Sequence, residues 1–121
     1  MYTCACCGYK TLSEPVGSYE ICSVCGWEDD PVQLANPCTR GGANTESLLE
    51  AQSNFELITR ESDLHDLHRK GVEKDSVWRK LNILEAEIFS KESNAVEWIN
   101  KAIYSIADVY WNRDIVEEKL K

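Results

Sequence analysis

The feature that most constrains the fold is a pair of Cys-x-x-Cys-Gly turns near the start of the chain. Cys4 and Cys7 belong to the first turn, Cys22 and Cys25 belong to the second, and residues 8–21 separate them. A turn of this kind points two sulfurs at one centre, and two turns supply the four soft ligands of a closed tetrahedral site. We therefore expect Cys4, Cys7, Cys22 and Cys25 to form a structural Zn²⁺ site with no open position for a catalytic water.

The remaining candidate ligands leave alternatives open. Iron suits the same four sulfurs, so zinc and iron both stay possible metals. Cys6 is next to Cys7 and would compete with it for the metal. Cys38 would replace one of the four ligands or pair with Cys6. We expect Cys6 to be a free thiol that points away from the metal and Cys38 to be a spectator in a loop. His65 and His68 have the spacing of a second metal site, although two histidines on a helix more often meet only solvent.

The bulk composition is that of a small soluble domain. The chain has 121 residues, of which 43% are hydrophobic, and this is the size of one ordinary domain. No apolar run approaches the ~20 residues that a membrane crossing needs. The first residues contain neither a basic patch nor an apolar segment, so we expect no signal peptide and a cytoplasmic protein. Paired cysteines in that compartment bind metals more often than they form disulfides.

The charge is acidic and unevenly distributed. The formal net charge is −8, and residues 1–55 hold only Lys10 and Arg40 as basic residues. The acids of the same stretch are Glu14, Glu20, Glu28, Asp29, Asp30, Glu46 and Glu50. Phosphate contacts need clustered Lys and Arg, so we expect no nucleic-acid partner and favour a basic protein surface. The run Glu28-Asp29-Asp30 indicates a solvated acidic turn, with a contact for a cationic partner or a hard-cation site as alternatives.

The first half of the chain predicts a metal-bound ribbon and a helix that covers it. Residues 9–12 and 18–21 are β-prone and flank a turn with Pro and Gly, so we expect them to form a hairpin between the knuckles. Residues 28–44 contain two prolines and a Gly-Gly pair and are expected to be irregular. Apolar spacing then predicts a helix from about Glu46 to Thr59, with Asn44 or Thr45 as its cap.

The second half of the chain is predicted to be helical. A short helix should end at Gly71, and two antiparallel helices over residues 76–91 and 95–119 should form a helical hairpin. The expected fold is α+β, with an N-terminal zinc ribbon of rubredoxin-like knuckles packed on the C-terminal helical hairpin. The ribbon and its covering helix would occupy residues 1–59 and the helical region residues 60–121, packed as one compact unit.

Three motifs resemble the bacterial cysteine-rich CPCC family. They are Cys4-Ala5-Cys6-Cys7-Gly8-Tyr9, Cys22-Ser23-Val24-Cys25-Gly26-Trp27-Glu28-Asp29-Asp30-Pro31-Val32-Gln33 and Arg40-Gly41-Gly42-Ala43-Asn44. The resemblance covers residues 1–55, and Ala5 and Ser23 stand where the family typically has proline. It implies a metal-bound ribbon followed by a helix. It implies no established activity, because the family is defined by its sequence and not by a reaction.

We expect the protein to bind a partner and not to be an enzyme. Small acidic bacterial proteins that join a family module to a variable helical tail look like immunity proteins, so the expected partner is a cognate basic bacterial toxin. The partner surface should combine the acidic tripeptide with an exposed aromatic side chain among acids. Its residues would be Glu28, Asp29, Asp30, Asp108, Trp111 and Asp114.

Three alternatives to this function stay open. A homodimer would cover the exposed aromatic side chain with a second copy of the chain. A regulatory or nucleic-acid-linked zinc-ribbon protein would also contain two such knuckles, although the acidic net charge disfavours contacts with phosphates. An enzyme would need a second metal held by the Glu28-Asp29-Asp30 turn and Asn44, and no Ser or Cys has the sequence context of a nucleophile.

Overall fold

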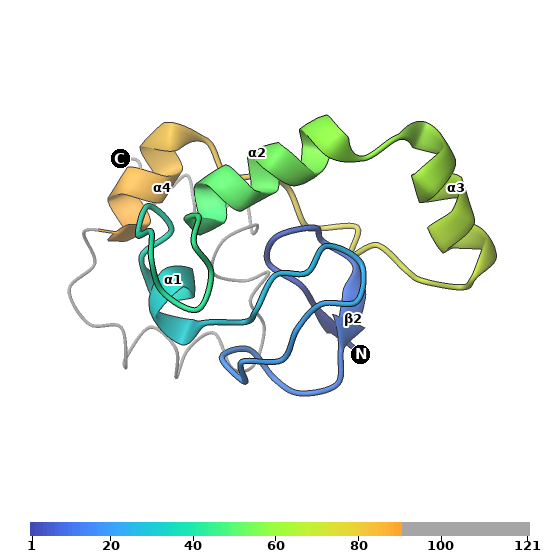
Figure 1. The fold of residues 1–121 in the computed structure, drawn as a ribbon, viewed down its shortest axis with the longest axis horizontal. Helices are drawn as coiled ribbons and strands as arrows, with labels where there is room; N and C mark the ends of the chain where they lie inside the picture. The colour runs from blue at the N-terminus through green and yellow to red at the C-terminus, as the bar shows by residue number, and fades with distance from the viewer. Residues whose placement is uncertain (91–121) are drawn as a thin grey trace.

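The computed structural model describes residues 1–90, which form a small α+β structure with a two-stranded antiparallel sheet and four helices (Figure 1). In chain order the elements are β1 (Tyr2–Thr3), β2 (Lys10–Leu12), α1 (Pro31–Ala35), α2 (Leu48–Ile58), α3 (Glu61–Arg69) and α4 (Ile83–Ser90). The largest fully buried apolar side chains come from β2, α1, α2 and the segment before α4. They are Leu12, Leu34, Leu48 and Leu81.

Part of the predicted fold lies outside the described residues. The predicted helix over residues 95–119 belongs to that part, as do the predicted partner-surface residues Asp108, Trp111 and Asp114. The packing of a helical hairpin on the ribbon and the division into residues 1–59 and 60–121 therefore stay predictions. None of the helices within residues 1–90 has both the length and the apolar character that crossing a membrane requires.

The first cysteine turn is a knuckle closed by backbone hydrogen bonds. The N–H of Gly8 donates to the carbonyl of Cys4, and the N–H of Cys4 donates to the carbonyl of Tyr9, both at 2.9 Å. Gly8 has a φ of 81°, in the left-handed region that glycine enters without the clash of a Cβ atom. The turn reverses the chain, so β1 and β2 lie side by side, with Tyr2 opposite Leu12.

The second cysteine turn repeats this geometry. The N–H of Gly26 donates to the carbonyl of Cys22, and the N–H of Cys22 donates to the carbonyl of Trp27, again at 2.9 Å. Gly26 has a φ of 79°. An antiparallel bridge joins Ile21 to Glu28 on either side of the turn, in the place that β1 and β2 occupy at the first knuckle.

The predicted hairpin between residues 9–12 and 18–21 is therefore wrong in its pairing. Each segment pairs across its own knuckle: β2 with β1, and Ile21 with Glu28. The physical reason is the closed backbone of each knuckle. The hydrogen bonds from the N–H of Cys4 to the carbonyl of Tyr9 and from the N–H of Cys22 to the carbonyl of Trp27 bring the two flanking segments of each knuckle side by side.

Side-chain caps decide where α1 and α2 begin. Asp30 accepts from the N–H of Val32 at 2.8 Å, and Pro31 occupies the first turn of α1, a helix that the sequence analysis missed. Ser47 and Glu50 form a capping box at the start of α2, with both hydrogen bonds at 3.1 Å. The prediction that Asn44 or Thr45 caps α2 is therefore wrong.

Helix α2 lies against the first knuckle, as predicted. Gln52, which is 1% exposed, donates from Nε2 to the carbonyl of Ala5 and accepts at Oε1 from the N–H of Leu81, both at 2.9 Å. The contact face is shorter than the sequence indicates, because Ile58 at the end of α2 is 76% exposed. Helix α3 then ends before Gly71, which has a φ of 79°, as predicted.

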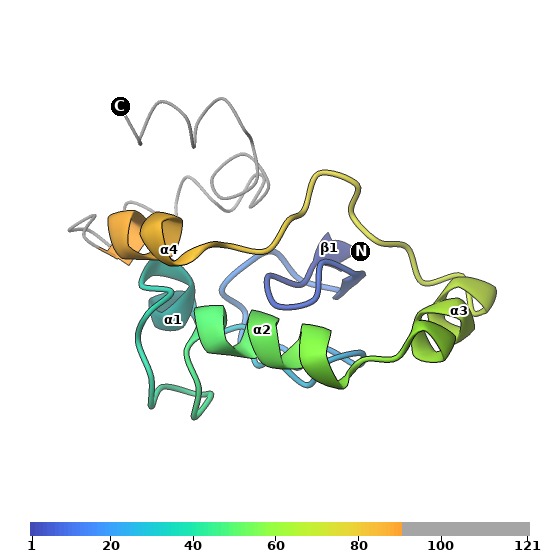
Figure 2. The ribbon, with the colours of Figure 1, turned by 90° about the horizontal axis from the view of Figure 1, so that it is seen from above.

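The helix predicted over residues 76–91 begins only at Ile83. Figure 2 shows the chain returning from α3 past the first knuckle before α4 starts. In this segment the carbonyl of Glu73 accepts from the N–H of Lys10, and the N–H of Asp75 donates to the carbonyl of Gly8, both at 2.8 Å. Further along, the indole Nε1 of Trp78 donates to the carbonyl of Ala5 and the N–H of Leu81 donates to Oε1 of Gln52, both at 2.9 Å. Tertiary contacts thus override the helical periodicity of residues 76–82.

Candidate metal centre

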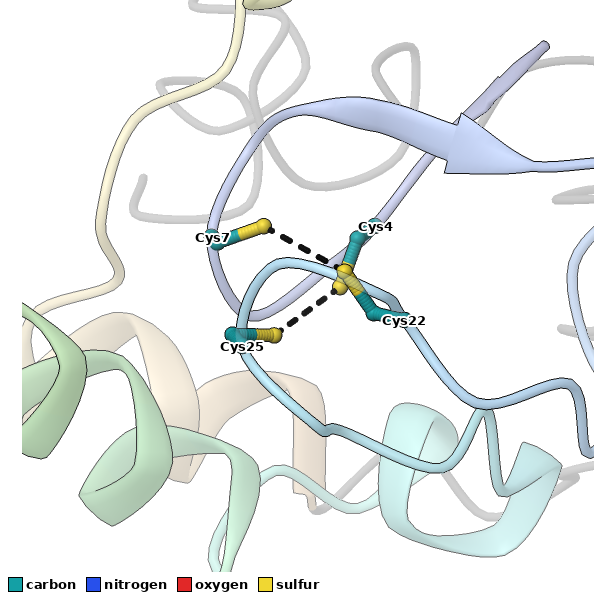
Figure 3. A group of neighbouring side chains, drawn as sticks. All are labelled: Cys4, Cys7, Cys22 and Cys25. Atoms are coloured by element: carbon teal, nitrogen blue, oxygen red, sulfur yellow. Dashed lines mark hydrogen bonds between the residues drawn. The ribbon is translucent and has the colours of Figure 1, made fainter. Parts of the chain in front are cut away.

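Four sulfurs from the two knuckles converge on one point (Figure 3). The Sγ atoms of Cys4, Cys7, Cys22 and Cys25 all lie within 4.8 Å of one another. Cys4 Sγ is 3.6 Å from Cys25 Sγ, and Cys7 Sγ is 3.7 Å from Cys22 Sγ. Four sulfurs around a metal with bonds of ~2.3 Å form a tetrahedron with edges of about 3.8 Å. The spacing of the sulfurs thus fits a four-coordinate metal ion, as the sequence predicts.

The surroundings of the four sulfurs bury three of them and add hydrogen bonds. Cys4 and Cys7 are fully buried, and Cys22 is 2% exposed. The hydroxyl of Thr11 lies 3.0 Å from Cys22 Sγ, and the N–H of Val24 donates to the same sulfur at 3.4 Å. Hydrogen bonds of this kind orient a ligand and tune its charge. The sequence analysis missed Thr11, whose role depends on the contact between the two knuckles.

The sulfurs change one another's affinity for protons. The contact with Cys22 is the main cause that raises the pKa of the Cys4 and Cys7 thiols, and it lowers the pKa of the Cys25 thiol. Cys25 raises the pKa of Cys22, but the contacts with Cys4 and Cys7 outweigh it and lower that pKa to about 6. A metal binds thiolates, so its binding would release the protons that Cys4 and Cys7 retain.

The aromatic residues after the two glycines belong to the same core. Tyr9 is 7% exposed and Trp27 is 3% exposed, and both lie in one buried cluster with the cysteines. Burial is the main cause that raises the pKa of the Tyr9 hydroxyl, with a smaller contribution from Cys7. These side chains separate the sulfurs from solvent, which is typical of a structural site and not of a catalytic one.

The two remaining cysteines differ from each other. All six cysteines of the chain are free thiols, so no disulfide joins Cys6 to Cys38. Cys38 is exposed and lies apart from the four sulfurs. Cys6 is a free thiol outside the group of four sulfurs, as expected. It is nevertheless buried, at 3% exposed, and the neighbouring Cys25 sulfur raises the pKa of the Cys6 thiol.

The acidic tripeptide is not a solvated turn, because two of its three carboxylates are buried. Asp29 is 1% exposed and accepts at Oδ2 from the N–H of Gly17 at 2.7 Å and of Ser18 at 3.2 Å. Burial raises the pKa of Asp29 against the lowering effect of these hydrogen bonds. Asp30 is 5% exposed, and its Oδ2 accepts from the N–H of Ala43 at 2.9 Å. Both carboxylates hold the chain together and present little surface to a partner.

The Arg-Gly-Gly-Ala-Asn motif is fixed by a second polar network, centred on Gln33. The Nε2 of Gln33 donates to the carbonyls of Thr39, Asn44 and Glu46 at 3.1, 3.0 and 3.0 Å. The side chain of Asn44 donates from Nδ2 to the carbonyl of Glu28 at 2.8 Å and accepts from the N–H of Glu28 at 3.0 Å. Asn44 therefore has a structural role, and the same holds for the backbone of the loop around it.

The alternative metal sites gain no support within residues 1–90. There, the four cysteines make up the group of neighbouring side chains that could hold a metal ion. The carboxylates of Asp29 and Asp30 are taken up by backbone N–H groups. His65 and His68 are both exposed on α3.

The comparison with known families agrees with this arrangement. A family model described as cysteine-rich CPCC matches residues 2–74. The chain belongs to the cysteine-rich CPCC family. The match extends beyond residues 1–55, so the CPCC segment includes α3 and the chain that returns to the first knuckle. No curated protein matches the sequence.

Proposed function

We propose that Cys4, Cys7, Cys22 and Cys25 hold a structural Zn²⁺ ion. The observation that carries the proposal is the sulfur spacing of 3.6 and 3.7 Å along two edges of the cluster, close to the edge of about 3.8 Å that a zinc–sulfur tetrahedron has. Four thiolates leave no open coordination position, and Cys4, Cys7 and Cys22 are buried. Bound there, the ion would supply folding free energy to a segment with few strands and a small core.

Metal analysis of the purified protein tests this proposal. We expect one zinc per chain, and we expect Cys7→Ser to lose the metal because Cys7 is a fully buried member of the cluster. Cys38→Ser is the matched control, since it removes an exposed thiol outside the cluster. A coloured, iron-loaded protein would favour iron over zinc. Full zinc binding by Cys7→Ser would contradict the ligand set.

For the whole chain we propose a protein-binding role without catalysis. Support comes from the corner between α2 and α3, where Leu57 is 82% exposed and Ile58 is 76% exposed. No residue of α3 is buried, and this helix lies at the far end of the molecule from α1 and α4 (Figure 1 and Figure 2). Adjacent exposed apolar side chains on a small protein are typical of an interaction site.

We propose that the partner is a basic protein and that the role is that of an immunity protein toward a cognate bacterial toxin in the cytoplasm. The net charge of −8 would steer a basic partner toward this protein. Because Asp29 and Asp30 are buried, the proposed surface is the α2–α3 corner, formed by Leu57, Ile58 and Leu64. The predicted contribution of Asp108, Trp111 and Asp114 stays a prediction.

Co-purification with the product of a neighbouring gene tests the binding role. We expect a complex that weakens as salt is added, because charge speeds the encounter. Ile58→Asp should weaken it, whereas Val77→Asp, which changes an exposed residue outside the corner, should not. A complex that Ile58→Asp leaves intact would exclude this surface. A gel shift with nucleic acid at low salt would favour the regulatory zinc-ribbon alternative.

A further inference from the structure

A fifth sulfur lies beside the four that form the metal centre. Cys6 is 3% exposed, and it is not one of the four sulfurs that surround the metal position. Cys6 and Cys25 line the same cavity of about 90 Å³, together with the side chains of Trp27 and Phe55. The cavity thus gives access to one metal ligand and to a neighbouring thiol.

Of the four ligands, Cys25 is the one that a small reagent would reach. Cys4, Cys7 and Cys22 are buried, whereas Cys25 is partly exposed and lines the cavity. A water molecule needs roughly 10–15 Å³ of such space, so a molecule of the size of hydrogen peroxide fits within about 90 Å³. A metal-bound cysteine is a thiolate, which is the form of cysteine that reacts with peroxides.

We propose that Cys25 and Cys6 form a redox modification site, in which a peroxide joins the two sulfurs in a disulfide and so removes one thiolate from the metal. This inference rests on the metal centre proposed above. It assigns Cys25 as the sulfur that is oxidised first and Cys6 as the sulfur that resolves the product. The oxidant is a peroxide, which accepts the two electrons that the two sulfurs lose.

The reaction balances in two steps. The Cys25 thiolate attacks a peroxide oxygen, so a sulfur–oxygen bond forms as the oxygen–oxygen bond breaks and hydroxide leaves. The Cys6 thiol gives its proton to that hydroxide, which becomes water. The Cys6 sulfur then attacks the Cys25 sulfur, so the disulfide forms as the sulfur–oxygen bond breaks. The second hydroxide takes a proton from solvent, and one peroxide has become two waters.

Loss of the Cys25 thiolate would loosen the second knuckle at its contact with α2. The cavity that holds Cys25 is also lined by Phe55 and Ile58 from the end of α2. Three thiolates remain around a metal position that needs four, so the ion would be released. Oxidation would therefore act on the same end of α2 that contributes to the proposed partner surface.

Treatment of the metal-loaded protein with hydrogen peroxide tests the proposal. Metal content is measured first, and its absence would count against the metal centre. A chromogenic chelator then follows metal release, and peptide mapping without reductant locates the disulfide. We expect a Cys6–Cys25 cross-link that is about 2 Da lighter than the two reduced peptides, formed in step with metal release. A disulfide among Cys4, Cys7 and Cys22 with Cys6 still reduced would overturn it.

Variants of Cys6 separate this role from a structural one. Cys6→Ser and Cys6→Ala should both bind the metal, because the four ligands are intact. Both should lose the disulfide and accumulate a sulfenic acid at Cys25 that dimedone traps. Cys38→Ser changes an exposed thiol and should react as the unsubstituted protein does. A Cys25 that carries no sulfenic acid after peroxide treatment of both Cys6 variants would overturn the proposal. If neither variant folds, the peptide map of the unsubstituted protein decides.

Discussion

The indole of Trp78 lies so close to Gly8 that the first knuckle has no room for a side chain there. A Cβ atom built on Gly8 would be 2.5 Å from Cδ2 of Trp78. The indole Nε1 also donates to the carbonyl of Ala5 at 2.9 Å. The two contacts fix a residue from the late part of the described chain to the turn that supplies the first two metal ligands.

Replacing Gly8 and Gly26 by alanine, one at a time, tests how tightly the indole of Trp78 packs on Gly8 through the change in the free energy of unfolding. Gly8 and Gly26 both have a φ near 80°, at 81° and 79°, so each substitution should cost about 1–2 kcal/mol of backbone strain. At Gly26 no atom lies within 4 Å of the added Cβ, whereas at Gly8 the indole of Trp78 is in the way. We expect Gly8→Ala to cost about 1–3 kcal/mol more than Gly26→Ala.

Denaturant unfolding of the metal-loaded variants gives the two free energies of unfolding. Gly26→Ala is the matched control, because it has the same backbone strain without the overlap. Equal losses for the two variants would mean that Trp78 moves aside freely and that its contact with Gly8 is not tight.

Gln33→Leu should destabilise the protein strongly, by about 3–5 kcal/mol. Gln33 is fully buried, and the substitution leaves the carbonyls of Thr39, Asn44 and Glu46 without its amide donors. Asn36→Ala is the control, since Asn36 makes an exposed hydrogen bond at the end of the same helix. Thermal or denaturant unfolding measures both, and a small loss for Gln33→Leu would show that water replaces the network at low cost.

The ion pair between Arg79 and Glu85 should make stability depend on pH in the acid range. Burial raises the pKa of Glu85, but the hydrogen bonds from Arg79 and from the N–H of Asn82 outweigh it, so its pKa is lowered. An acid with a lowered pKa stabilises the folded state above its unfolded pKa of ~4.3. That contribution is lost as the pH falls through the pKa of the folded state. Glu85→Gln should reduce this dependence, measured by unfolding from pH 7 to pH 3.

At neutral pH, Arg79→Met should destabilise the protein, because it leaves the carboxylate of Glu85 buried without its partner. The side chain of Glu85 is 1% exposed, but that of Arg79 is 39% exposed. Solvent screening reduces the cost to about 2 kcal/mol, below that of a fully buried pair. The double variant Arg79→Met, Glu85→Gln should recover part of the loss, and no recovery would argue against a specific pair.

Removal of the metal should unfold both knuckles before the helices. The N–H groups of Cys4 and Cys22 close the two turns, and without an ion nothing joins the sulfurs of one turn to those of the other. Hydrogen exchange of these amides should be slow in the metal-loaded protein and fast after treatment with a chelator. The N–H of Ala51 within α2 serves as the internal comparison. Unchanged protection of Cys4 and Cys22 would mean that the core alone holds the knuckles.

Much of the candidate site could be predicted because its determinants are local. The spacing of Cys4 to Cys7 and of Cys22 to Cys25 fixes the direction of each pair of sulfurs within a single turn. The breaker Gly71 marks the end of α3 for the same reason, since a left-handed residue ends a helix without help from distant parts of the chain. These features needed no knowledge of how the segments pack.

The features that the sequence did not indicate depend on contacts between distant segments. Whether Asp29 is solvated or buried depends on where the N–H groups of Gly17 and Ser18 lie. Cys6 and Cys25 line one cavity only because the two knuckles pack together. An acidic side chain or a thiol has no local signal for its burial, so composition and spacing leave these questions open.

The amino-acid sequence by itself determined the four cysteines of the candidate metal site, the two knuckles and the existence of α2 and α3, because short-range spacing and turn residues specify them. Only the tertiary structure decided which strands pair, why α4 starts as late as Ile83 and which carboxylates are buried. The physical reason is that these features depend on hydrogen bonds between segments far apart in the chain, such as those of Trp78 with Ala5 and of Leu81 with Gln52. Tertiary contacts of this kind override the helical preference that local periodicity indicates.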